Sequence, residues 1–560
     1  MLQKIVMIII MSSIIFGMIG CGENAMEKKF RTFVQDHVEK MEPLMKEWNL
    51  SYWNASLTGK KEDFDKTAEY ELKIRTIYSD TSAFAYLKDL KESDQIKNLL
   101  LKRHLDLLYN AYLSNQIEPD MLKQIVSKSS AIENKFNVFR GKIGDQEVTD
   151  NEIKEILKKE TDSSKRRDAW FASKQVGKEV ANDLIELIKL RNQAAQELGF
   201  ENYYLMSLTV SEQNLEELTK IFNELAELTD EPFAKMKTEL DSILADRYGI
   251  GVEGMMPWHY HDPFFQEGPM VYEVNLDKYY EDQDVKELAQ KFYTGINLAV
   301  DDILARSDLY EKQGKNPHAY CTSIDRKEDV RILANIKNNE SWMETMLHEL
   351  GHAVYDKYID KSLPFLLREP AHIFTTEAIA MFFGRLSRNA DWLQDMLDLG
   401  DEEGDKIASV VQKSLRLRQL VFARWCQVMF RFEQELYKNP DQNLNTLWWE
   451  LVEKYQLVKR PTGRTEPDWA AKIHFTMAPV YYHNYMLGEL LASQLHAYIV
   501  KNVLKLESDD GVSYVNENIV GNYLKKRVFS DGTKHRWNEM ITQATGENLT
   551  AKYFVDQFVR

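Results

Sequence analysis

The 560-residue sequence predicts a mainly α-helical protein with one small antiparallel β-sheet. Apolar residues recur every three or four positions through most of the chain, as in "DQIKNLLLKRHLDLLYNAYL" (residues 94–113), and this period is typical of amphipathic helices. Strand-like alternation is rare. Two short β-prone runs, "AYCTSID" (319–325) and "DVRILANIK" (329–337), predict a hairpin. The length allows one large core or two lobes around a cleft.

The bulk composition is that of an ordinary globular protein. The chain is 44% hydrophobic and 28% charged, and its formal net charge is -17. Non-specific nucleic-acid binding needs a basic surface, so this charge argues against a nucleic-acid partner.

The first 25 residues, "MLQKIVMIIIMSSIIFGMIGCGENA", differ from the rest. Lys4 precedes an apolar run from Ile5 to Ile19, which is the pattern of an export signal and is short for a membrane span. The segment "MIGC" resembles the bacterial lipobox, in which the cysteine is lipidated after cleavage. We therefore expect a signal peptide at residues 1–20 and a lipid anchor on Cys21, outside the cytoplasm of a bacterium. A plain secretory signal and an uncleaved anchor are the alternatives.

Two further cysteines, Cys321 and Cys426, complete the set of three. An exported chain of this length with two cysteines is not a disulfide scaffold. They form either one bridge or two buried thiols, and the latter is the expectation. Neither has a CxxC partner, which argues against a cysteine-based zinc site.

The order of the predicted elements suggests one unit, residues 21–560, with two halves. Residues from about 27 to 200 have a helical pattern throughout, and no repeat or low-complexity linker interrupts them. Prolines and aromatic residues between 249 and 272 predict a long ordered loop. Helices resume after it, apart from the hairpin. We expect an N-terminal helical half, about 27–250, and a catalytic half, about 251–560.

The stretch "MLHELGHAV" (346–354) is the strongest candidate for a metal site. On a helix, His348 and His352 lie on one face about one turn apart, so that both imidazoles can reach one Zn²⁺. Glu349 points to the neighbouring face, where it can hold a water molecule at the metal. The alternative is a half-buried helix whose histidines are satisfied by hydrogen bonds.

A catalytic zinc site needs a third protein ligand, and Glu377 is the candidate. It opens the apolar run "EAIAMFFG" (377–384), where a carboxylate is costly unless it is paired or bound to a metal. An acidic residue favoured by the dipole at a helix N-terminus is the alternative.

Three ordered blocks resemble the angiotensin-converting-enzyme family of zinc peptidyl-dipeptidases. "HELGH", "LPFLLRE" and "TTEAIA" are similar to that family's HEMGH, LPxxLREG and HEAIGD at nearly the same spacing. "AAKIHF" and "PVYYHNYM" are similar to its AAKFHI and PYIRYF, and "HAYCTSIDRKEDVRI" resembles the stretch that enters its substrate-lining strand. The blocks cover about residues 318–487. The resemblance implies a large helical, two-lobed metallopeptidase with a deep central cleft and one zinc per chain.

The resemblance also implies roles for the zinc-motif residues. His348, His352 and Glu377 would be the zinc ligands. Glu349 would be the general base that takes a proton from the attacking water and passes it to the leaving amine.

Further roles come from the later blocks. His474 and Tyr485 match the family's donors to the oxyanion, Lys472 and Tyr482 match residues that bind the substrate's C-terminal carboxylate, and His318 matches a histidine that contacts the substrate backbone. Each has a plainer alternative: a core histidine, core aromatic rings or a solvated lysine. Tyr481 or Tyr482 is an alternative to Tyr485.

The sequence departs from the family pattern at three places. Met381 stands where the family has an aspartate that follows the third ligand, so another carboxylate, with Glu369 as candidate, would orient the histidines. The family's glutamine in the dipeptide-carboxylate pocket falls near Tyr260, which argues against strict dipeptide release. Asn484 replaces the chloride-binding arginine, so chloride activation is not implied.

The function that these features favour is zinc-dependent hydrolysis of short peptides, with release of C-terminal dipeptides. The alternatives are an endo-acting oligopeptidase similar to the thimet family and a non-catalytic surface lipoprotein. The sequence leaves the natural peptide and the oligomeric state open.

Overall fold

The computed structural model describes residues 24–272, 275–509 and 512–559. The signal peptide (1–20) and Cys21 lie outside these residues, so both stay predictions. No helix among the described residues is long and apolar enough to span a bilayer.

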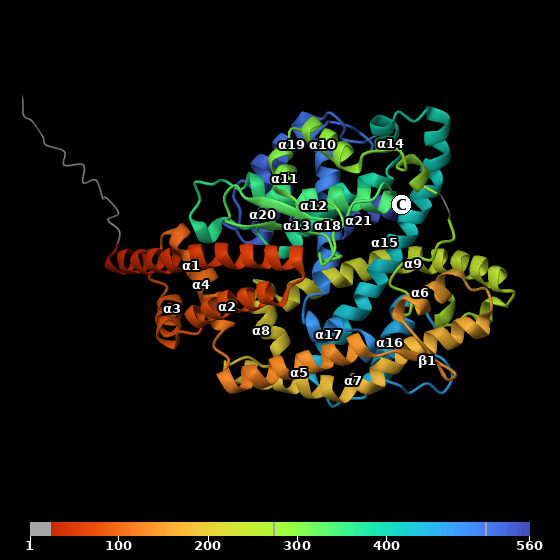
Figure 1. Cartoon of the computed structure of the whole chain (residues 1–560), viewed down its shortest axis with the longest axis horizontal. Coiled ribbons are helices and arrows are strands. Elements are labelled where there is room, and N and C mark those ends of the chain that lie inside the picture. Colours follow the sequence, from red (N-terminus) through yellow and green to blue (C-terminus); the bar gives the residue numbers. More distant parts are fainter. Residues whose placement is uncertain (1–23, 273–274, 510–511, 560) are drawn as a thin grey trace, which may run out of the picture.

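The first half of the chain folds into helices, as predicted (Figure 1). Most begin with a side-chain cap; in α7, for example, the Asp162 carboxylate accepts the N–H groups of Ser164 and Lys165. The helices of this half are α1 (Ala25–Thr58), α2 (Lys61–Tyr78), α3 (Thr81–Ser93), α4 (Leu99–Leu113), α5 (Pro119–Val138), α6 (Asp150–Lys159), α7 (Ser163–Glu197), α8 (Tyr203–Val210) and α9 (Leu215–Tyr248).

One element of this half was not predicted. Strands β1 (Gly141–Ile143) and β2 (Gln146–Val148) form an antiparallel hairpin, so the expectation of unbroken helices from 27 to 200 is wrong at this point. Gly144 turns the chain with a φ of 60°, a conformation that glycine adopts without strain. Three-residue strands are too short to show alternation in the sequence.

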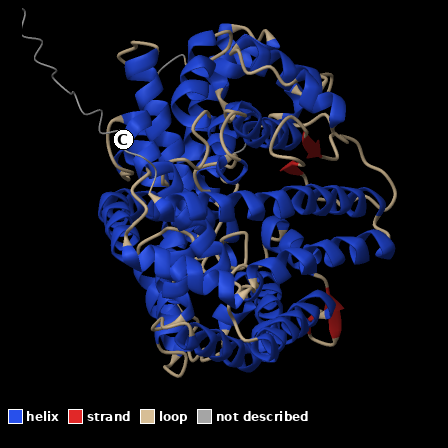
Figure 2. Ribbon diagram, turned by 90° about the vertical axis from the view of Figure 1, so that its left-hand side faces the viewer, coloured by secondary structure: helices blue, strands red, loops and turns tan. Residues whose placement is uncertain are grey.

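The loop predicted for residues 249–272 is present, and it extends to α10. Its described residues contain only short 3₁₀ turns, at Val252–Gly254, Pro257–His259 and Asp277–Tyr279. The predicted hairpin before the HELGH segment is confirmed as strands β3 (Tyr320–Ser323) and β4 (Val330–Leu333), which pair antiparallel. Figure 2 shows both hairpins as small elements in a molecule dominated by helices.

The second half is again helical. Its helices are α10 (Val285–Gly295), α11 (Asp301–Arg306), α12 (Glu340–Tyr358), α13 (Ile373–Gly384), α14 (Ala390–Leu397), α15 (Asp401–Lys438), α16 (Leu444–Gln456), α17 (His474–Met477), α18 (His483–Tyr498), α19 (Asn518–Leu524), α20 (Trp537–Thr545) and α21 (Lys552–Phe558). In Figure 1, α5, α6, α7 and α16 lie in the lower part of the molecule, while α10, α11, α12 and α19 lie in the upper part.

Helices α12, α13 and α18 pack side by side near the middle of the molecule (Figure 1). Two glycines allow this close approach. A Cβ on Gly351 would lie 2.7 Å from the Ala380 Cα, and one on Gly488 would lie 3.4 Å from the Glu377 Cβ. The sequences of α12 and α13 therefore bring the HELGH segment and Glu377 onto facing surfaces. Cys321 and Cys426 are free thiols, as expected.

Candidate active site

The three predicted metal ligands converge between α12 and α13. Their ligand atoms all lie within 4.8 Å of one another. The Glu377 Oε2 lies 3.8 Å from His348 Nε2 and 3.9 Å from His352 Nε2. Glu377 is the fifth residue of α13, so the favourable dipole at the helix N-terminus does not account for its position.

The electrostatics of this trio suit a bound cation. Burial lowers the pKa of His348 and lowers that of His352 further, so both imidazoles are neutral donors of an electron pair. Burial, together with the nearby Glu489, raises the pKa of Glu377 to about 7. Two neutral imidazoles and one desolvated carboxylate form the ligand set that zinc prefers, so the residues fit this metal.

Glu349 is buried beside the trio, with 8% of its surface exposed. Burial, with a smaller contribution from the neighbouring Glu377, raises the pKa of Glu349 to about 8, although the backbone N–H of Cys321 opposes both effects. The carboxyl group of Glu349 thus lies between α12 and strand β3. A cation nearby would stabilise its charged form.

The ring of His352 is oriented by a hydroxyl group. The Thr376 Oγ1 lies 2.7 Å from His352 Nδ1, which leaves Nε2 to face Glu377. Glu369, the sequence-based candidate for this task, pairs instead with Arg326 and is half exposed. That expectation is therefore corrected: a threonine next to the third ligand holds the histidine.

We expect Thr376→Val to weaken zinc binding by roughly 10–100-fold, because outer contacts that orient a ligating histidine have effects of this size. Valine keeps the shape of threonine and removes only the hydroxyl. Competition with a chelator at equilibrium measures the affinity without relying on activity. Glu369→Gln is the matched control, and an equal loss of affinity in both variants would contradict the assignment.

Two tyrosines of the PVYYHNYM segment lie near the trio. Glu377 raises the pKa of both Tyr481 and Tyr485, although burial is the larger cause for each. Their rings contact each other, with centroids 5.3 Å apart. Tyr481 and Tyr485 thus both lie near Glu377, so the role predicted for Tyr485 stays a prediction.

A second group of residues, the ammonium cluster, surrounds Lys472, whose surface is 7% exposed. Its ammonium lies 5.3 Å from the ring centroids of Trp425 and Tyr482 and 5.4 Å from that of Phe264. The Tyr482 oxygen accepts a hydrogen bond from Trp425 Nε1 at 2.8 Å. The hydroxyl proton of Tyr482 therefore remains available for a ligand.

Gln266 completes this cluster, and the sequence analysis missed it. Its Oε1 accepts a hydrogen bond from Lys472 Nζ, which leaves its amide N–H groups free to donate. Tyr260, the position expected to replace the family's glutamine, is instead buried against Lys237 and Asp241. The expectation at Tyr260 is wrong, because Gln266 and not Tyr260 contacts Lys472. The "FFQ" that follows two prolines was the available signal.

His474 is the first residue of α17. It lies between the tyrosines near the metal trio and the cluster around Lys472. Its ring packs against that of Tyr482, with centroids 5.1 Å apart, and Tyr482 in turn contacts Tyr485. The His474 Nδ1 is buried without a hydrogen-bond partner among the described residues. Burial lowers the pKa of His474 to about 4, with a smaller contribution from Lys472.

His318 is the one predicted site residue that lies apart. It is exposed, and its backbone N–H bonds to Asn316 Oδ1. Its neighbour Ala319 lines the cavity at the metal trio, whereas His318 is not part of that lining.

Two cavities are lined in part by residues of α12. One, of about 680 Å³, is lined by His348, Glu349, His352 and Asp356. The other, of about 580 Å³, is lined by Ser341 at the start of the same helix. Fifteen residues separate Ser341 from Asp356, a distance of about 22 Å along a helix.

Gln266 of the ammonium cluster lines the second cavity, as does Met381, one turn after Glu377 on α13. The metal trio thus has one cavity on the side of Asp356 and another on the side of Gln266.

Comparisons with known proteins agree with this geometry. The family model Peptidase_M2, described as angiotensin-converting enzyme, matches residues 24–261 and 263–559. The angiotensin-converting enzyme of Theromyzon tessulatum is 22% identical over 72% of this chain and 70% of its own length. The thermostable carboxypeptidase 1 of Pyrococcus furiosus is 24% identical over 66% of this chain and 72% of its own length.

Another relative is named as inactive. The inactive angiotensin-converting enzyme-related protein of Caenorhabditis elegans is 22% identical over 58% of this chain, and the match covers 40% of that longer protein. This chain thus spans less than half of the nematode protein.

Proposed function

The chain belongs to the angiotensin-converting-enzyme family of peptidases, and from that premise we propose that it is a zinc-dependent exopeptidase that removes dipeptides from the C-terminus of short peptides. The single observation that supports this most is that two groups of functional side chains lie at two cavities beside α12 and α13. His348, His352 and Glu377 form a metal-ligand set, and the Lys472 cluster lies at the adjacent cavity.

Peptidases of this family are zinc metalloenzymes, and His348, His352 and Glu377 would hold the ion here. When bound, zinc supplies Lewis-acid polarisation of the scissile carbonyl and activation of water. All other chemistry falls to side chains of the cleft.

Glu349 accepts a proton from the attacking water and delivers it to the leaving amine, which is the role of a general base that then acts as an acid. It lies next to His348 in sequence and lines the same cavity. The Tyr485 hydroxyl, beside Glu377, donates to the oxygen on which negative charge develops. His474, with its unpartnered nitrogen, is the second donor.

The ammonium cluster binds the C-terminal carboxylate of the substrate. Lys472 supplies the charge, Tyr482 an O–H donor and Gln266 an N–H donor. Charge-assisted hydrogen bonds of this kind are the strong ones. A peptide held by its terminus presents a fixed bond to the metal, which makes the reaction an exopeptidase reaction.

We expect Lys472→Ala to reduce kcat/KM for a free-acid peptide by roughly ten- to a hundredfold, because hydrogen bonds to charged groups contribute about 1.5–3 kcal/mol. The same peptide with an amidated C-terminus should be a poor substrate for the wild type and nearly indifferent to the mutation. Steady-state kinetics on the four enzyme–substrate pairs isolate the contact.

The matched control for this prediction is Lys315→Met, which removes another buried lysine. The Lys315 ammonium pairs with Asp308 at 2.8 Å, and Lys315 lines neither of the two cavities. Its loss should leave the acid-to-amide ratio unchanged. If Lys472→Ala slows both peptides equally, Lys472 is a structural residue and an endo-acting oligopeptidase becomes the better assignment.

Mass spectrometry of the products from a ladder of peptides tests the proposed function directly. Loss of two residues from the C-terminus, at every length, is the expected result. Internal cleavage at a fixed side chain would favour the endopeptidase. Absence of products from zinc-loaded protein would favour a non-catalytic binding protein, as the name of the nematode relative illustrates.

We also propose that the protein is exported and lipid-anchored through Cys21. The support is the apolar leader followed by "MIGC". Mass spectrometry of the mature N-terminus tests this, because an unmodified terminus before Cys21 would exclude the anchor.

A further inference from the structure

Asp262 organises the loop that precedes the ammonium cluster. Its carboxylate, 6% of the residue being exposed, accepts three backbone hydrogen bonds from its own loop. They come from the N–H groups of Phe264 at 2.8 Å, Gln266 at 3.0 Å and Glu267 at 3.1 Å. One side chain therefore folds residues 262–267 into a compact turn.

The loop holds a backbone conformation that its residues rarely adopt alone. His261 and Phe265 have φ values of 66° and 50°, in the left-handed region that disfavours side chains. Such a conformation persists only where surrounding contacts determine it. The three bonds to Asp262 are among the contacts that do so, together with the bond from the Met270 N–H to His261 Nδ1.

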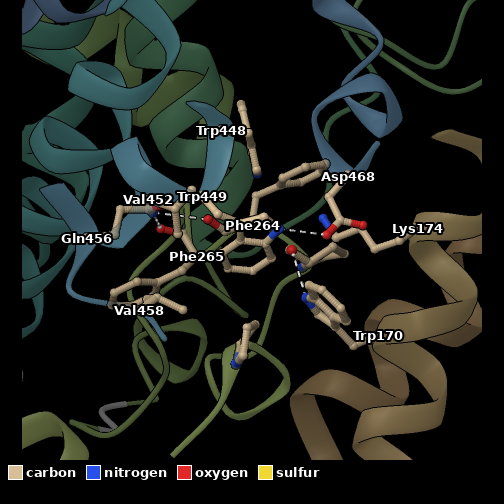
Figure 3. A pocket seen from close by; sticks show the side chains of 12 residues that line it. Trp170, Lys174, Phe264, Phe265, Trp448, Trp449, Val452, Gln456, Val458 and Asp468 are labelled. Carbon is tan, nitrogen blue, oxygen red and sulfur yellow. Dashed lines mark hydrogen bonds between the residues drawn. The ribbon is translucent and has the colours of Figure 1, made fainter. Parts of the chain in front are cut away.

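Neighbouring helices fix the outer side of the same loop. Trp170 Nε1 of α7 donates to the Pro263 carbonyl at 3.0 Å. Gln456 Nε2 of α16 donates to the carbonyls of Phe264 and Phe265. Figure 3 shows Trp170 and Gln456 on opposite sides of the two phenylalanines.

The inner side of the loop faces Lys472. Gln266 Oε1 accepts from the Lys472 ammonium, and the Phe264 ring lies 5.4 Å from it. Both contacts come from the turn that Asp262 closes. Asp262 itself lines the cavity together with Gln266.

The charges around Lys472 show why this carboxylate matters. Burial lowers the pKa of Lys472 to about 8, and Lys154 lowers it slightly. The Lys174 Nζ lies 3.2 Å from the centroid of the Phe264 ring, and burial lowers the pKa of Lys174 to about 7. The groups that raise the pKa of Lys472 are, in order, Asp262, Cys426 and Glu267.

We propose that Asp262 is a positioning residue for substrate anchoring: its carboxylate folds the turn that holds Phe264 and Gln266 against Lys472, and its charge keeps that lysine an ammonium. The inference rests on the proposed carboxylate anchor. Asp262 does not touch the reacting atoms, and its effect passes through Lys472 and Gln266.

Asp262→Asn removes the charge and leaves one oxygen to accept backbone hydrogen bonds. We expect kcat/KM for a free-acid peptide to fall by roughly three- to thirtyfold, which is the range of coupling between contacting residues. The loss should lie mainly in KM, because anchoring rather than chemistry is impaired. The amidated peptide should lose much less, so the acid-to-amide ratio should shrink.

The pH profile adds a readout that a merely structural role would not change. The ammonium of Lys472 is lost as the pH rises through its pKa, so free-acid hydrolysis should decline on an alkaline limb near pH 8 in the wild type. Without the Asp262 carboxylate that pKa falls, and the limb should move to lower pH. The amidated peptide should show no such displacement.

Asp325→Asn is the matched control. The Asp325 carboxylate also closes its own loop by accepting three backbone N–H groups, those of Lys327, Glu328 and Asp329. It should leave the acid-to-amide ratio unchanged. In a Lys472→Ala background, Asp262→Asn should have a smaller effect on that ratio, because only the part that passes through Gln266 remains.

Competitive labelling of Lys472 with an amine reagent across pH, read by mass spectrometry, separates this inference from the proposed function. Asp262→Asn should shift the labelling midpoint to lower pH whether or not the enzyme releases dipeptides. An unchanged midpoint, in a variant that melts like the wild type, would overturn the inference. If Asp262→Asn unfolds the protein, Asp262→Glu, which keeps the charge, should restore both folding and the wild-type midpoint; failure to do so would overturn it as well.

Discussion

Glu349→Gln should retain zinc and lose peptide hydrolysis, with kcat lower by roughly 10²–10⁴-fold or more. Glutamine has the shape of glutamate but cannot accept a proton from water. Glu349 is not one of the three converging ligands, so its replacement leaves the ligand set intact. Metal analysis and single-turnover kinetics on the same preparation measure the two expectations together.

The matched control is Glu344→Gln, on the same helix and five residues earlier. Glu344 pairs with Arg388 at 3.3 Å and contributes charge near His348 without lying in the cavity lining. We expect only a small change in kcat. Near wild-type turnover by Glu349→Gln would identify another group as the base, and a parallel loss in both variants would indicate a general effect of α12 charge.

The zinc motif could be predicted from sequence because its geometry is local. Four residues of a helix bring His348 and His352 onto one face whatever the surrounding fold. Glu377 was accessible for a different reason: a carboxylate in an apolar helix stands out by its energetic cost. The close contact through Gly351 that brings these two helices together is not visible in either segment alone.

The ammonium cluster around Lys472 shows the limit of such reasoning. Gln266 and Lys472 are 206 residues apart, and their contact depends on a turn held by Asp262 and on helices α7 and α16. No periodic pattern encodes that contact, so matching by spacing placed the glutamine at Tyr260. The His352–Thr376 bond could not be predicted for a related reason. A carboxylate is the expected partner of a ligating histidine, whereas the fold supplies a hydroxyl.

Loss of any zinc ligand should remove both the metal and the activity. We expect about one zinc per chain in the purified protein and almost none in His348→Ala or Glu377→Ala, because a catalytic zinc needs three protein ligands. The loss of affinity should exceed the roughly 10–100-fold expected from an outer contact such as Thr376. Elemental analysis, and activity before and after treatment of the wild type with a chelator, measure these effects.

Thermal melting separates loss of the metal from loss of the fold. A ligand that binds only the folded state raises its stability, so zinc should raise the Tm of the wild type and have little effect on either variant. The metal-free trio keeps a desolvated carboxylate at Glu377 with no cation beside it, so removing that group should not lower the Tm of the metal-free protein. The control is His535→Ala, which replaces a half-buried histidine beside Asp531. Its zinc content, activity and Tm should match those of the wild type. Full zinc occupancy in His348→Ala or Glu377→Ala would exclude that residue from the ligand set, and the convergence of α12 and α13 would then need another explanation.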